Sequence, residues 1–232
     1  LIDPWLEGTE VDLARWFNTQ WHRTPPLAYA ALPEFDAVLV TQKYPDHCHR
    51  ETLLRLQPPV VMAPACLGPA LRRLLPEARL CLFDAHLRQH TLGNVRIRQL
   101  PSRRGLDPVY HAYLIEDGAR TLMIANHGFD ADISHFPHIH SRPVDLLLSP
   151  FNLYRLPRML GGYVTPGLPG LERLVEQVAP QRVAQTHDEL KHAKGLIPAL
   201  ADVVAFDADQ RHSLPWLQDR FLAIDGYQKV VL

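Results

Sequence analysis

The chain has 232 residues, 47% of them hydrophobic, which is enough for a sizeable core in one large domain or two small ones. Its 24 basic and 25 acidic side chains give a formal net charge of -1, so no net field attracts nucleic acid or an anionic membrane. No apolar run approaches the roughly 20 residues that cross a bilayer, and no secretory signal opens the chain. We expect a cytoplasmic protein with a single domain over residues 1–232.

Short apolar, β-branched runs alternate with helical patterns along the chain, which is typical of a layered α/β protein. Strands are predicted at residues 37–40, 60–63, 95–100, 111–115, 121–125, 145–148, 182–185 and 203–206. Helices are predicted at residues 11–17, 50–56, 69–74 and 171–178. Prolines and glycines lie mainly between these runs, where they mark turns.

The three cysteines, Cys48, Cys66 and Cys81, are odd in number and show no close pairing. This pattern favours reduced thiols over a disulfide framework or a zinc knuckle. Cys48 is predicted to be a small buried residue and not a nucleophile.

The sequence turns abruptly polar after the strand predicted at residues 37–40. Asp46, His47, Cys48 and His49 then follow one another directly before a helix. Active-site residues favour such strand ends. Carboxylate, imidazole and thiolate groups bind zinc, and Asp or His also transfers protons. The loop is therefore the candidate active site, although His49 is predicted to be a polar cap of the helix that follows it.

The segment 41–47, Thr-Gln-Lys-Tyr-Pro-Asp-His, resembles the metallo-β-lactamase signature T-H-x-H-x-D-H. Residues 2–4 resemble the family's early I-D-P segment, residues 120–128 its strand and turn with a bridging aspartate, and residues 182–187 its closing strand with a ligand histidine. The most similar branch contains ascorbate-phosphate lactonase. The resemblance implies an α/β fold, a four-layer αββα sandwich. Because the chain opens on Leu1 without an initiator methionine, we expect a missing upstream segment that holds the first N-terminal strands.

The family binds two metal ions, the first through three histidines. Gln42 and Tyr44 stand where two of these histidines are expected, and the segment 101–104 places an arginine where the third is expected. The resemblance therefore implies that the first metal site is dismantled.

The second site of the family consists of an aspartate, a histidine, a bridging aspartate and the last histidine. Asp46, His47 and His187 match three of these positions. Asn126 aligns with the bridging aspartate, but the neighbouring His127 is a better ligand. The resemblance thus implies one divalent ion held by Asp46, His47, His127 and His187, with zinc as the first choice and manganese, iron or nickel as alternatives.

Two functional hypotheses follow. In the first, the chain is a metal-dependent hydrolase of a small ester, lactone or phosphodiester, in which Asp46 holds the attacking water and Tyr44 or Arg104 steadies the developing negative charge. Gln42, Arg104 and Asn126 then contact a small, anionic substrate. In the second, the chain binds no metal and serves as a ligand-binding or interaction module, with Gln42, Tyr44 and Arg104 as hydrogen-bonding groups.

Simpler interpretations of the same residues stay open. Asp46 can cap the following helix while His47 only packs. His187 can lie in an exposed turn, with Asp188 beside it as a supporting partner. His127 can belong to an ordinary sharp turn.

Three further segments carry a choice between interpretations. The run His135, His138 and His140 has ligand-like spacing but is predicted to be a surface loop. Arg103 and Arg104 form either a solvated turn or an anion-binding element. Residues 152–163 mix aromatics with glycines, which fits a substrate-facing loop, a hydrophobic surface turn or the contact of a homodimer.

Overall fold

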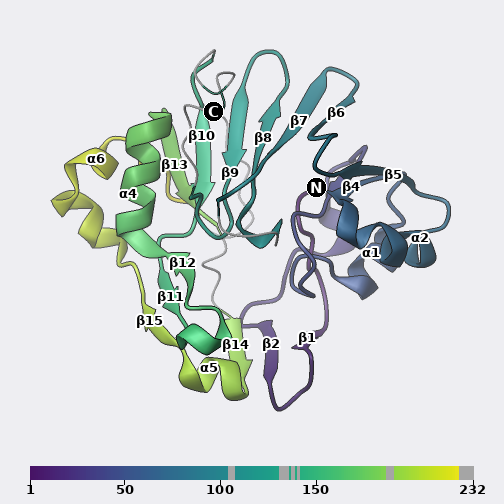
Figure 1. Cartoon of the computed structure of the whole chain (residues 1–232), viewed down its shortest axis with the longest axis horizontal. Coiled ribbons are helices and arrows are strands. Elements are labelled where there is room, and N and C mark those ends of the chain that lie inside the picture. The colour runs from purple at the N-terminus through teal and green to yellow at the C-terminus, as the bar shows by residue number, and fades with distance from the viewer. Residues whose placement is uncertain (104–107, 131–135, 137–138, 140–141, 187–190, 225–232) are drawn as a thin grey trace. The chain divides into compact units, whose positions relative to one another are not determined.

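The computed structural model describes residues 1–103, 108–130, 136, 139, 142–186 and 191–224. The chain forms two compact units, one of Leu1–Arg88 with Leu190–Ala199 and one of Gln89–Glu189 with Leu200–Leu232 (Figure 1). Each unit combines strands and helices, which confirms the predicted α/β class. A single domain over the whole chain stays a prediction. None of the helices that the structure describes has the length and apolar character needed to cross a bilayer.

The first unit contains a parallel sheet of β3 (Val38–Leu39), β4 (Val60–Pro64) and β5 (Arg79–Phe83). Parallel neighbours need a crossover connection, which α1 (Arg50–Leu56) and α2 (Gly68–Leu74) supply. Every residue of β4 is buried, as expected for a strand covered on both faces. The core of this unit consists of Val38, Val40, Leu53, Val61, Ala63, Leu67, Leu71 and Leu75. The first unit also contains the short 3-10 helices η1 (Tyr29–Ala31) and η2 (Ala65–Leu67).

A second sheet of the first unit is antiparallel and consists of β1 (Thr9–Asp12), β2 (Asn18–His22) and β14 (Lys191–Lys194). The helix predicted at residues 11–17 is therefore wrong. The chain reverses between β1 and β2 through Leu13, whose φ is 60°. The apolar residues that suggested a helix include Leu13 and Trp16, which are 84% and 70% exposed and bury no helix face.

The second unit is built on a six-stranded sheet in the order β13-β10-β9-β8-β7-β6. Its strands are β6 (Gln89–Leu92), β7 (Val95–Leu100), β8 (Ala112–Glu116), β9 (Thr121–Ile124), β10 (Leu146–Ser149) and β13 (Arg182–Gln185). β9, β10 and β13 run parallel, and the remaining pairs are antiparallel. α4 (Gly167–Val178) covers this sheet and buries Leu171, Leu174, Val175 and Val178 in the core that contains Met123, Leu147 and Val183 (Figure 1).

The second unit also has a small antiparallel sheet of β12 (Tyr163–Pro166), β11 (Leu153–Arg155) and β15 (Asp202–Val204). Residues 152–163 thus contain β11 and the 3-10 helix η5 (Arg158–Leu160), whose Met159 is 94% exposed. The second unit also contains η3 (Pro108–Tyr110), η6 (Ala208–Ser213) and α6 (Pro215–Gln218). The helix α5 (Leu196–Leu200) begins in the first unit.

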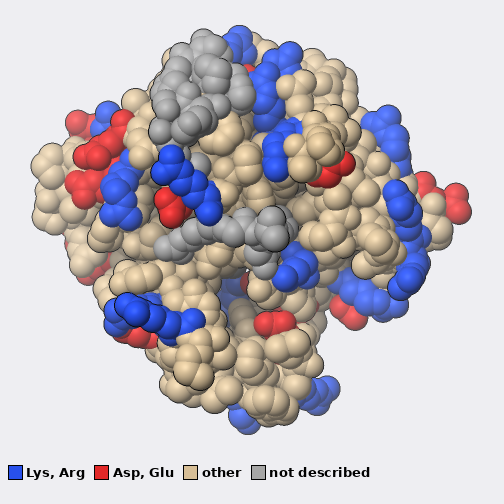
Figure 2. Space-filling model, in the orientation of Figure 1, with Lys and Arg blue, Asp and Glu red and all other residues tan. Residues whose placement is uncertain are grey.

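All eight predicted strands are present, and the helices predicted at residues 50–56, 69–74 and 171–178 are confirmed as α1, α2 and α4. α4 begins earlier than predicted, at Gly167. Basic and acidic side chains are mixed on the face shown in Figure 2, in agreement with the balanced charge of the sequence.

Gly195 connects β14 to α5 where the chain passes close to the turn between β1 and β2. Its φ is +126°, and a Cβ atom at this position would lie 2.6 Å from the carbonyl oxygen of Phe17. The amides of Leu196 and Ile197 donate to the carbonyls of Trp16 and Phe17, at 3.0 Å each, so this backbone contact is fixed from both sides.

We expect Gly195→Ala to destabilise the protein by about 1–3 kcal/mol more than Gly161→Ala, because both substitutions strain a positive φ but only the first adds an overlap. Gly161 is a matched control, since its φ is +117° and no atom lies within 4 Å of the added Cβ. Urea unfolding of both variants measures the difference. Equal losses of stability would show that the turn at Phe17 yields without strain.

Candidate functional site

The candidate loop follows β3, and Asp3 holds its first residue in place. Residues Leu1 and Asp3 lie beside β3, because Leu39 donates to the carbonyl of Leu1 and Asp3 donates to that of Leu39, at 2.9 Å each. The Asp3 carboxylate accepts from the Thr41 amide at 2.7 Å and from the Thr41 hydroxyl at 2.5 Å. The sequence did not predict this role for Asp3, although the I-D-P segment was the available signal.

His47 is buried, with an exposed fraction of 4%, and both of its ring nitrogens are engaged. Nδ1 lies 2.8 Å from Oδ2 of Asp3, and since a carboxylate only accepts, Nδ1 carries a proton. Nε2 lies 2.6 Å from the side-chain amide of Gln42 and 3.8 Å from Oδ2 of Asp46. A histidine backed by a carboxylate in this way has a fixed ring orientation, as metal-binding histidines have.

The charge around His47 is predominantly negative. Burial by itself lowers the pKa of His47, but the carboxylates of Asp46 and Asp3 outweigh it, so the pKa lies above its usual value. A protonated ring would donate from Nε2 to the oxygen of a turned Gln42 amide, whereas a neutral ring accepts from the amide nitrogen. A metal ion at Nε2 would take the place of that proton.

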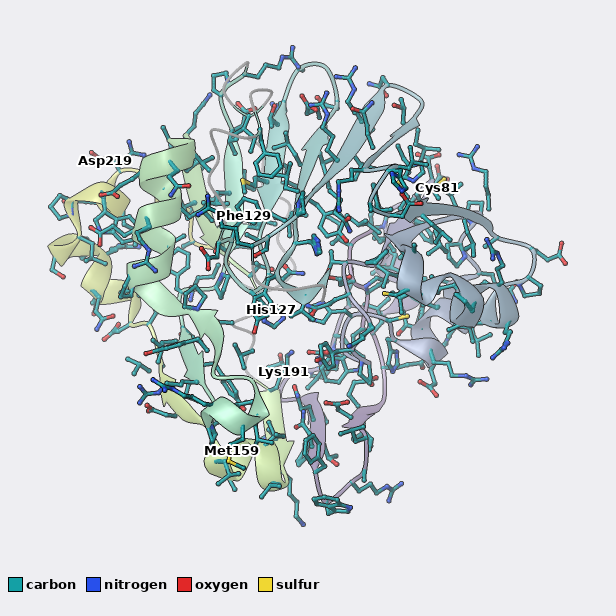
Figure 3. The ribbon with its side chains drawn as sticks, in the orientation of Figure 1. Cys81, His127, Phe129, Met159, Lys191 and Asp219 are labelled. Atoms are coloured by element: carbon teal, nitrogen blue, oxygen red, sulfur yellow. The ribbon has the colours of Figure 1, made fainter. Side chains whose placement is uncertain are left out.

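Asp46 pairs with Lys191 of β14, which Figure 3 labels. The Lys191 ammonium lies 3.3 Å from Oδ2 of Asp46, and both side chains are only 15% exposed. Lys191 also lies 5.5 Å from the centre of the Trp5 ring. Burial and the nearby Asp46 charge both raise the pKa of Asp12. The α1 helix begins at Arg50 with His49 as its cap, so the interpretation of Asp46 as a helix cap is wrong.

Tyr44 forms the turn of the loop through its backbone, since its carbonyl accepts from the amides of His47 and Cys48 at 3.0 and 2.8 Å. The ammonium of Lys43 lies 5.5 Å from the centre of the half-buried Tyr44 ring. The catalytic role of Tyr44 stays a prediction, as does the substrate-binding role of Gln42.

Asn126 and His127 belong to the second unit, where the chain leaves β9. Both are buried, with exposed fractions of 7%. The Gly128 amide closes the turn on the carbonyl of Ala125 at 2.9 Å. Nδ1 of His127 lies 3.1 Å from the Val164 carbonyl and therefore donates, which makes Nε2 the acceptor of the neutral ring. The choice between Asn126 and His127 as a ligand stays a prediction.

Several predicted residues lie outside the described part of the chain, namely Arg104, His135, His138, His140, His187 and Asp188. The ligand set Asp46, His47, His127 and His187 therefore also stays a prediction. Arg103 is described, and its amide donates to the Asp130 carbonyl at 2.8 Å.

A single metal ion fits the Asp46 and His47 atoms on one condition. The 3.8 Å between Asp46 Oδ2 and His47 Nε2 is close to the roughly 3.4 Å that separates two ligands of a tetrahedral zinc ion. However, Gln42 and Lys191 already contact these two atoms. The ion therefore fits only when Gln42 releases His47 and Lys191 releases Asp46, and it needs at least one further ligand, since catalytic zinc ions have three from the protein.

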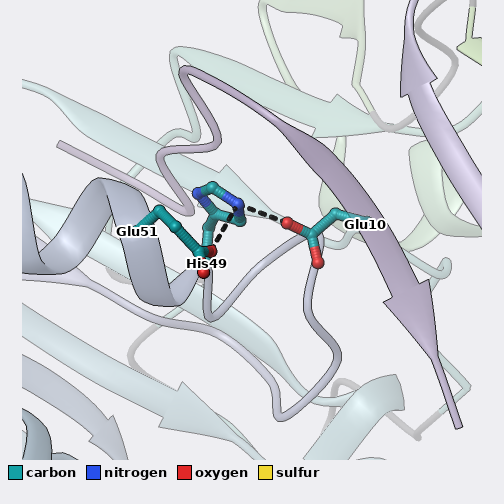
Figure 4. A group of neighbouring side chains, drawn as sticks. All are labelled: Glu10, His49 and Glu51. Carbon is teal, nitrogen blue, oxygen red and sulfur yellow. Dashed lines mark ion pairs between the residues drawn. The ribbon is translucent and has the colours of Figure 1, made fainter.

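A second group of potential ligands in the first unit consists of Glu10, His49 and Glu51 (Figure 4). Nε2 of His49 lies 2.5 Å from Glu10 and 3.2 Å from Glu51. Nδ1 of His49 accepts from the Thr52 amide at 3.1 Å as the cap of α1, so the proton of the neutral ring is on Nε2. The Nε2 proton therefore lies between two carboxylates. The bond from the Thr52 amide to Nδ1 confirms His49 as the polar cap of α1.

Comparison with known proteins identifies the fold. No family model and no curated protein matches the sequence. Among solved structures, the chain is similar to the isothiocyanate hydrolase from Delia radicum gut bacteria, with 14% identity and a TM-score of 0.61 over 95% of this chain and 87% of that one. These similarities show that the chain has the metallo-β-lactamase fold, as predicted.

Two other solved structures show the same similarity. A possible metal-dependent hydrolase from Veillonella parvula matches with 14% identity and a TM-score of 0.58 over 80% of this chain and 77% of that one. The E377D mutant of the β-hydroxylase CmlA matches with 19% identity and a TM-score of 0.59 over 85% of this chain. This chain spans 42% of the length of CmlA.

Replacing His49 tests its structural role. We expect His49→Ala to destabilise the protein by about 2–4 kcal/mol, because it removes a helix cap and leaves the Glu10 carboxylate buried beside an apolar group. Glu51→Ala is the control, since Glu51 is 61% exposed and should contribute less than about 1 kcal/mol. Urea unfolding measures both, and similar losses for the two variants would contradict the structural role of His49.

Cys48 offers a second test of the loop. Burial, with the Asp3 and Glu10 charges adding to it, raises the pKa of Cys48 to about 11. At pH 8 only about one molecule in a thousand then has a Cys48 thiolate. We expect iodoacetamide to label the exposed Cys66 of the folded protein and to leave Cys48 unlabelled until urea is added. Peptide mass spectrometry measures the labelling, and equal rates at both thiols would contradict the burial of Cys48.

Proposed function

We propose that the chain is a metal-dependent hydrolase that acts on a small ester, lactone or phosphodiester with one divalent ion. Zinc is the first choice for the ion, and manganese, iron or nickel are alternatives. The observation that carries the proposal is His47, oriented by Asp3 and placed beside Asp46. Two of the similar solved structures are hydrolases by name, which is in line with this function. The branch with ascorbate-phosphate lactonase is part of the proposal.

The residues of the loop have separate tasks in this proposal. Thr41 fixes the Asp3 carboxylate with two hydrogen bonds, and Asp3 keeps the Nδ1 proton of His47 in place. Nε2 and the Asp46 carboxylate are then the ligand atoms. When bound there, a divalent ion supplies a Lewis acid and lowers the pKa of a bound water molecule. Asp46 would hold the attacking water molecule in position.

Lys191 controls access to Asp46. Its ammonium balances the Asp46 charge in a site that is 15% exposed, where such a pair is screened less than on the surface. Any cation that binds Asp46 therefore competes with Lys191. The same ammonium, once released, is a positive group near the reacting atoms and can hold an anionic substrate.

A second candidate is a metal-free binding module, and the contacts of Gln42 and Lys191 favour it. The Gln42 amide satisfies Nε2 of His47, and the Lys191 ammonium satisfies Oδ2 of Asp46. In this alternative the loop keeps its shape through hydrogen bonds alone. The two candidates differ in whether zinc can displace Lys191.

Zinc binding by four proteins separates the candidates: the wild type, Asp46→Asn, Lys191→Met and Lys194→Met. We expect about one zinc per reconstituted wild-type chain, a large loss of affinity in Asp46→Asn, and roughly tenfold tighter binding in Lys191→Met, because the competing ammonium is gone. Lys194 is an exposed lysine of the same strand, so Lys194→Met should bind zinc as the wild type does. Calorimetry and elemental analysis measure the binding.

Hydrolysis of p-nitrophenyl acetate, a lactone and bis-p-nitrophenyl phosphate completes the test. The proposed hydrolase turns over at least one of these substrates, loses the activity to a chelator, and regains it with zinc. A wild-type chain with less than about a tenth of a zinc ion after reconstitution, together with a Lys191→Met variant that gains none, would rule out the metal-dependent function.

A further inference from the structure

The second unit has a recess of about 400 Å³ beside the turn that contains His127 and Phe129, which Figure 3 labels. We propose that this recess binds the oxyanion of a small molecule, a phosphate or carboxylate group of the substrate. The proposal names a substrate class and thus rests on the proposed hydrolase function. The polar residues that line the recess are Arg103, Tyr110, His127, Asp130, Arg173 and Gln177.

The charges around the recess favour an anion. Among the described residues that line the recess are two guanidinium groups, those of Arg103 and Arg173, and one carboxylate, that of Asp130, so these three carry one net positive charge. Guanidinium groups match the geometry of phosphate and carboxylate oxygens and bind them through two hydrogen bonds at once. A neutral ligand would gain nothing from this surplus charge.

α4 brings Arg173 and the start of a helix to the same recess. Pro166, Gly170, Arg173, Leu174 and Gln177 lie on one side of α4 and line it. Nη2 of Arg173 lies 3.9 Å from the place where a Cβ of Gly170 would be, so the guanidinium lies back along the helix toward its N-terminus. The side of α4 thus supplies a guanidinium group to the wall of the recess.

Two glycines beside the recess allow close packing on Pro166. A Cβ at Gly128 would lie 2.5 Å from Cγ of Pro166, and a Cβ at Gly170 would lie 2.3 Å from Cβ of the same proline. The turn after β9 therefore packs directly on the start of α4. Because this contact is tight, His127 and the first turn of α4 border the same space.

The remaining walls are fixed by hydrogen bonds. The Tyr110 hydroxyl donates to the Tyr163 carbonyl at 3.1 Å, and its ring stands edge-on to His127, with 6.0 Å between the ring centres. The Asp130 carbonyl accepts from the Arg103 amide at 2.8 Å and from the Ser102 hydroxyl at 3.2 Å. A recess with such walls loses little freedom when a ligand binds.

Binding of inorganic phosphate, measured by calorimetry at constant ionic strength with a chelator present, tests the proposal. We expect Arg173→Gln to weaken phosphate binding about tenfold, because one charge-assisted pair is lost. Asp130→Asn should strengthen it a few-fold, because the repelling carboxylate is gone. Arg158→Gln is the matched control, since Arg158 is an exposed arginine of the same unit that does not line the recess.

Acetate identifies the kind of oxyanion. Phosphate that binds more tightly than acetate supports a phosphorylated ligand, and equal binding of the two supports a carboxylated one. Equal effects of Arg173→Gln and Arg158→Gln, or no phosphate binding by the wild type, would overturn the proposal. Because these measurements need neither zinc nor turnover, binding that persists in a chain without hydrolytic activity would sink the hydrolase function and leave the oxyanion site standing.

Discussion

The Asp3 carboxylate is the contact on which the candidate loop depends. It receives three donors, the Thr41 amide, the Thr41 hydroxyl and Nδ1 of His47, at 2.7, 2.5 and 2.8 Å. One partly buried carboxylate thereby joins the segment before β1, the end of β3 and the imidazole. Without it, His47 would lose the orientation that makes Nε2 face Asp46, and the buried donors of Thr41 would lack their acceptor.

The charges of this group limit what the loop can bind. Asp3 and Asp46 are two carboxylates, and Lys191 supplies one ammonium, so one negative charge is left over while His47 is neutral. This surplus accounts for the raised pKa of His47, because a proton on the ring compensates it. A divalent ion brings two positive charges, whereas only one is needed to neutralise the surplus negative charge of these groups. Its binding is therefore coupled to the release of a proton, a movement of Lys191, or both.

The sequence predicted those elements whose patterns are local. β4 is an apolar run, β7 begins with alternating apolar and basic residues, and α1 begins where the cap His49 indicates. β14 has the sequence Lys-His-Ala-Lys, which carries no strand pattern and forms a strand only because β2 lies beside it. β2 also pairs with β1 in a hairpin. The local apolar period of this segment suggested a helix, but the pairing with neighbouring strands decides its structure. β5 was missed although Leu80 and Leu82 alternate in its sequence.

In the candidate site too, the residues of one loop could be predicted from the sequence, whereas their distant partners could not. Asp46, His47 and Gln42 stand in one loop and were predicted from it. The Lys191 partner of Asp46 is 145 positions away in the sequence, and the Asp3 partner of His47 is 44 positions away. The residues next to Lys191 give no sign of its pairing, and the I-D-P segment around Asp3 indicated the family resemblance but not the contact with His47. The motif therefore indicated candidate ligand atoms but not the protein groups that contact them.

The hydrogen bonds of the loop explain how its shape can be maintained without a metal ion. When a ligand histidine is lost, the buried atoms around the ion are left without a partner, which destabilises the fold. Gln42, which stands where the signature T-H-x-H-x-D-H has a histidine, contacts Nε2 of His47 at 2.6 Å, while Lys191 supplies a positive charge to Asp46. Both contacts restore the hydrogen bonds and charge that an ion would satisfy. The loop can then retain its geometry with or without a metal, so the same residues identify the fold more securely than they identify the activity.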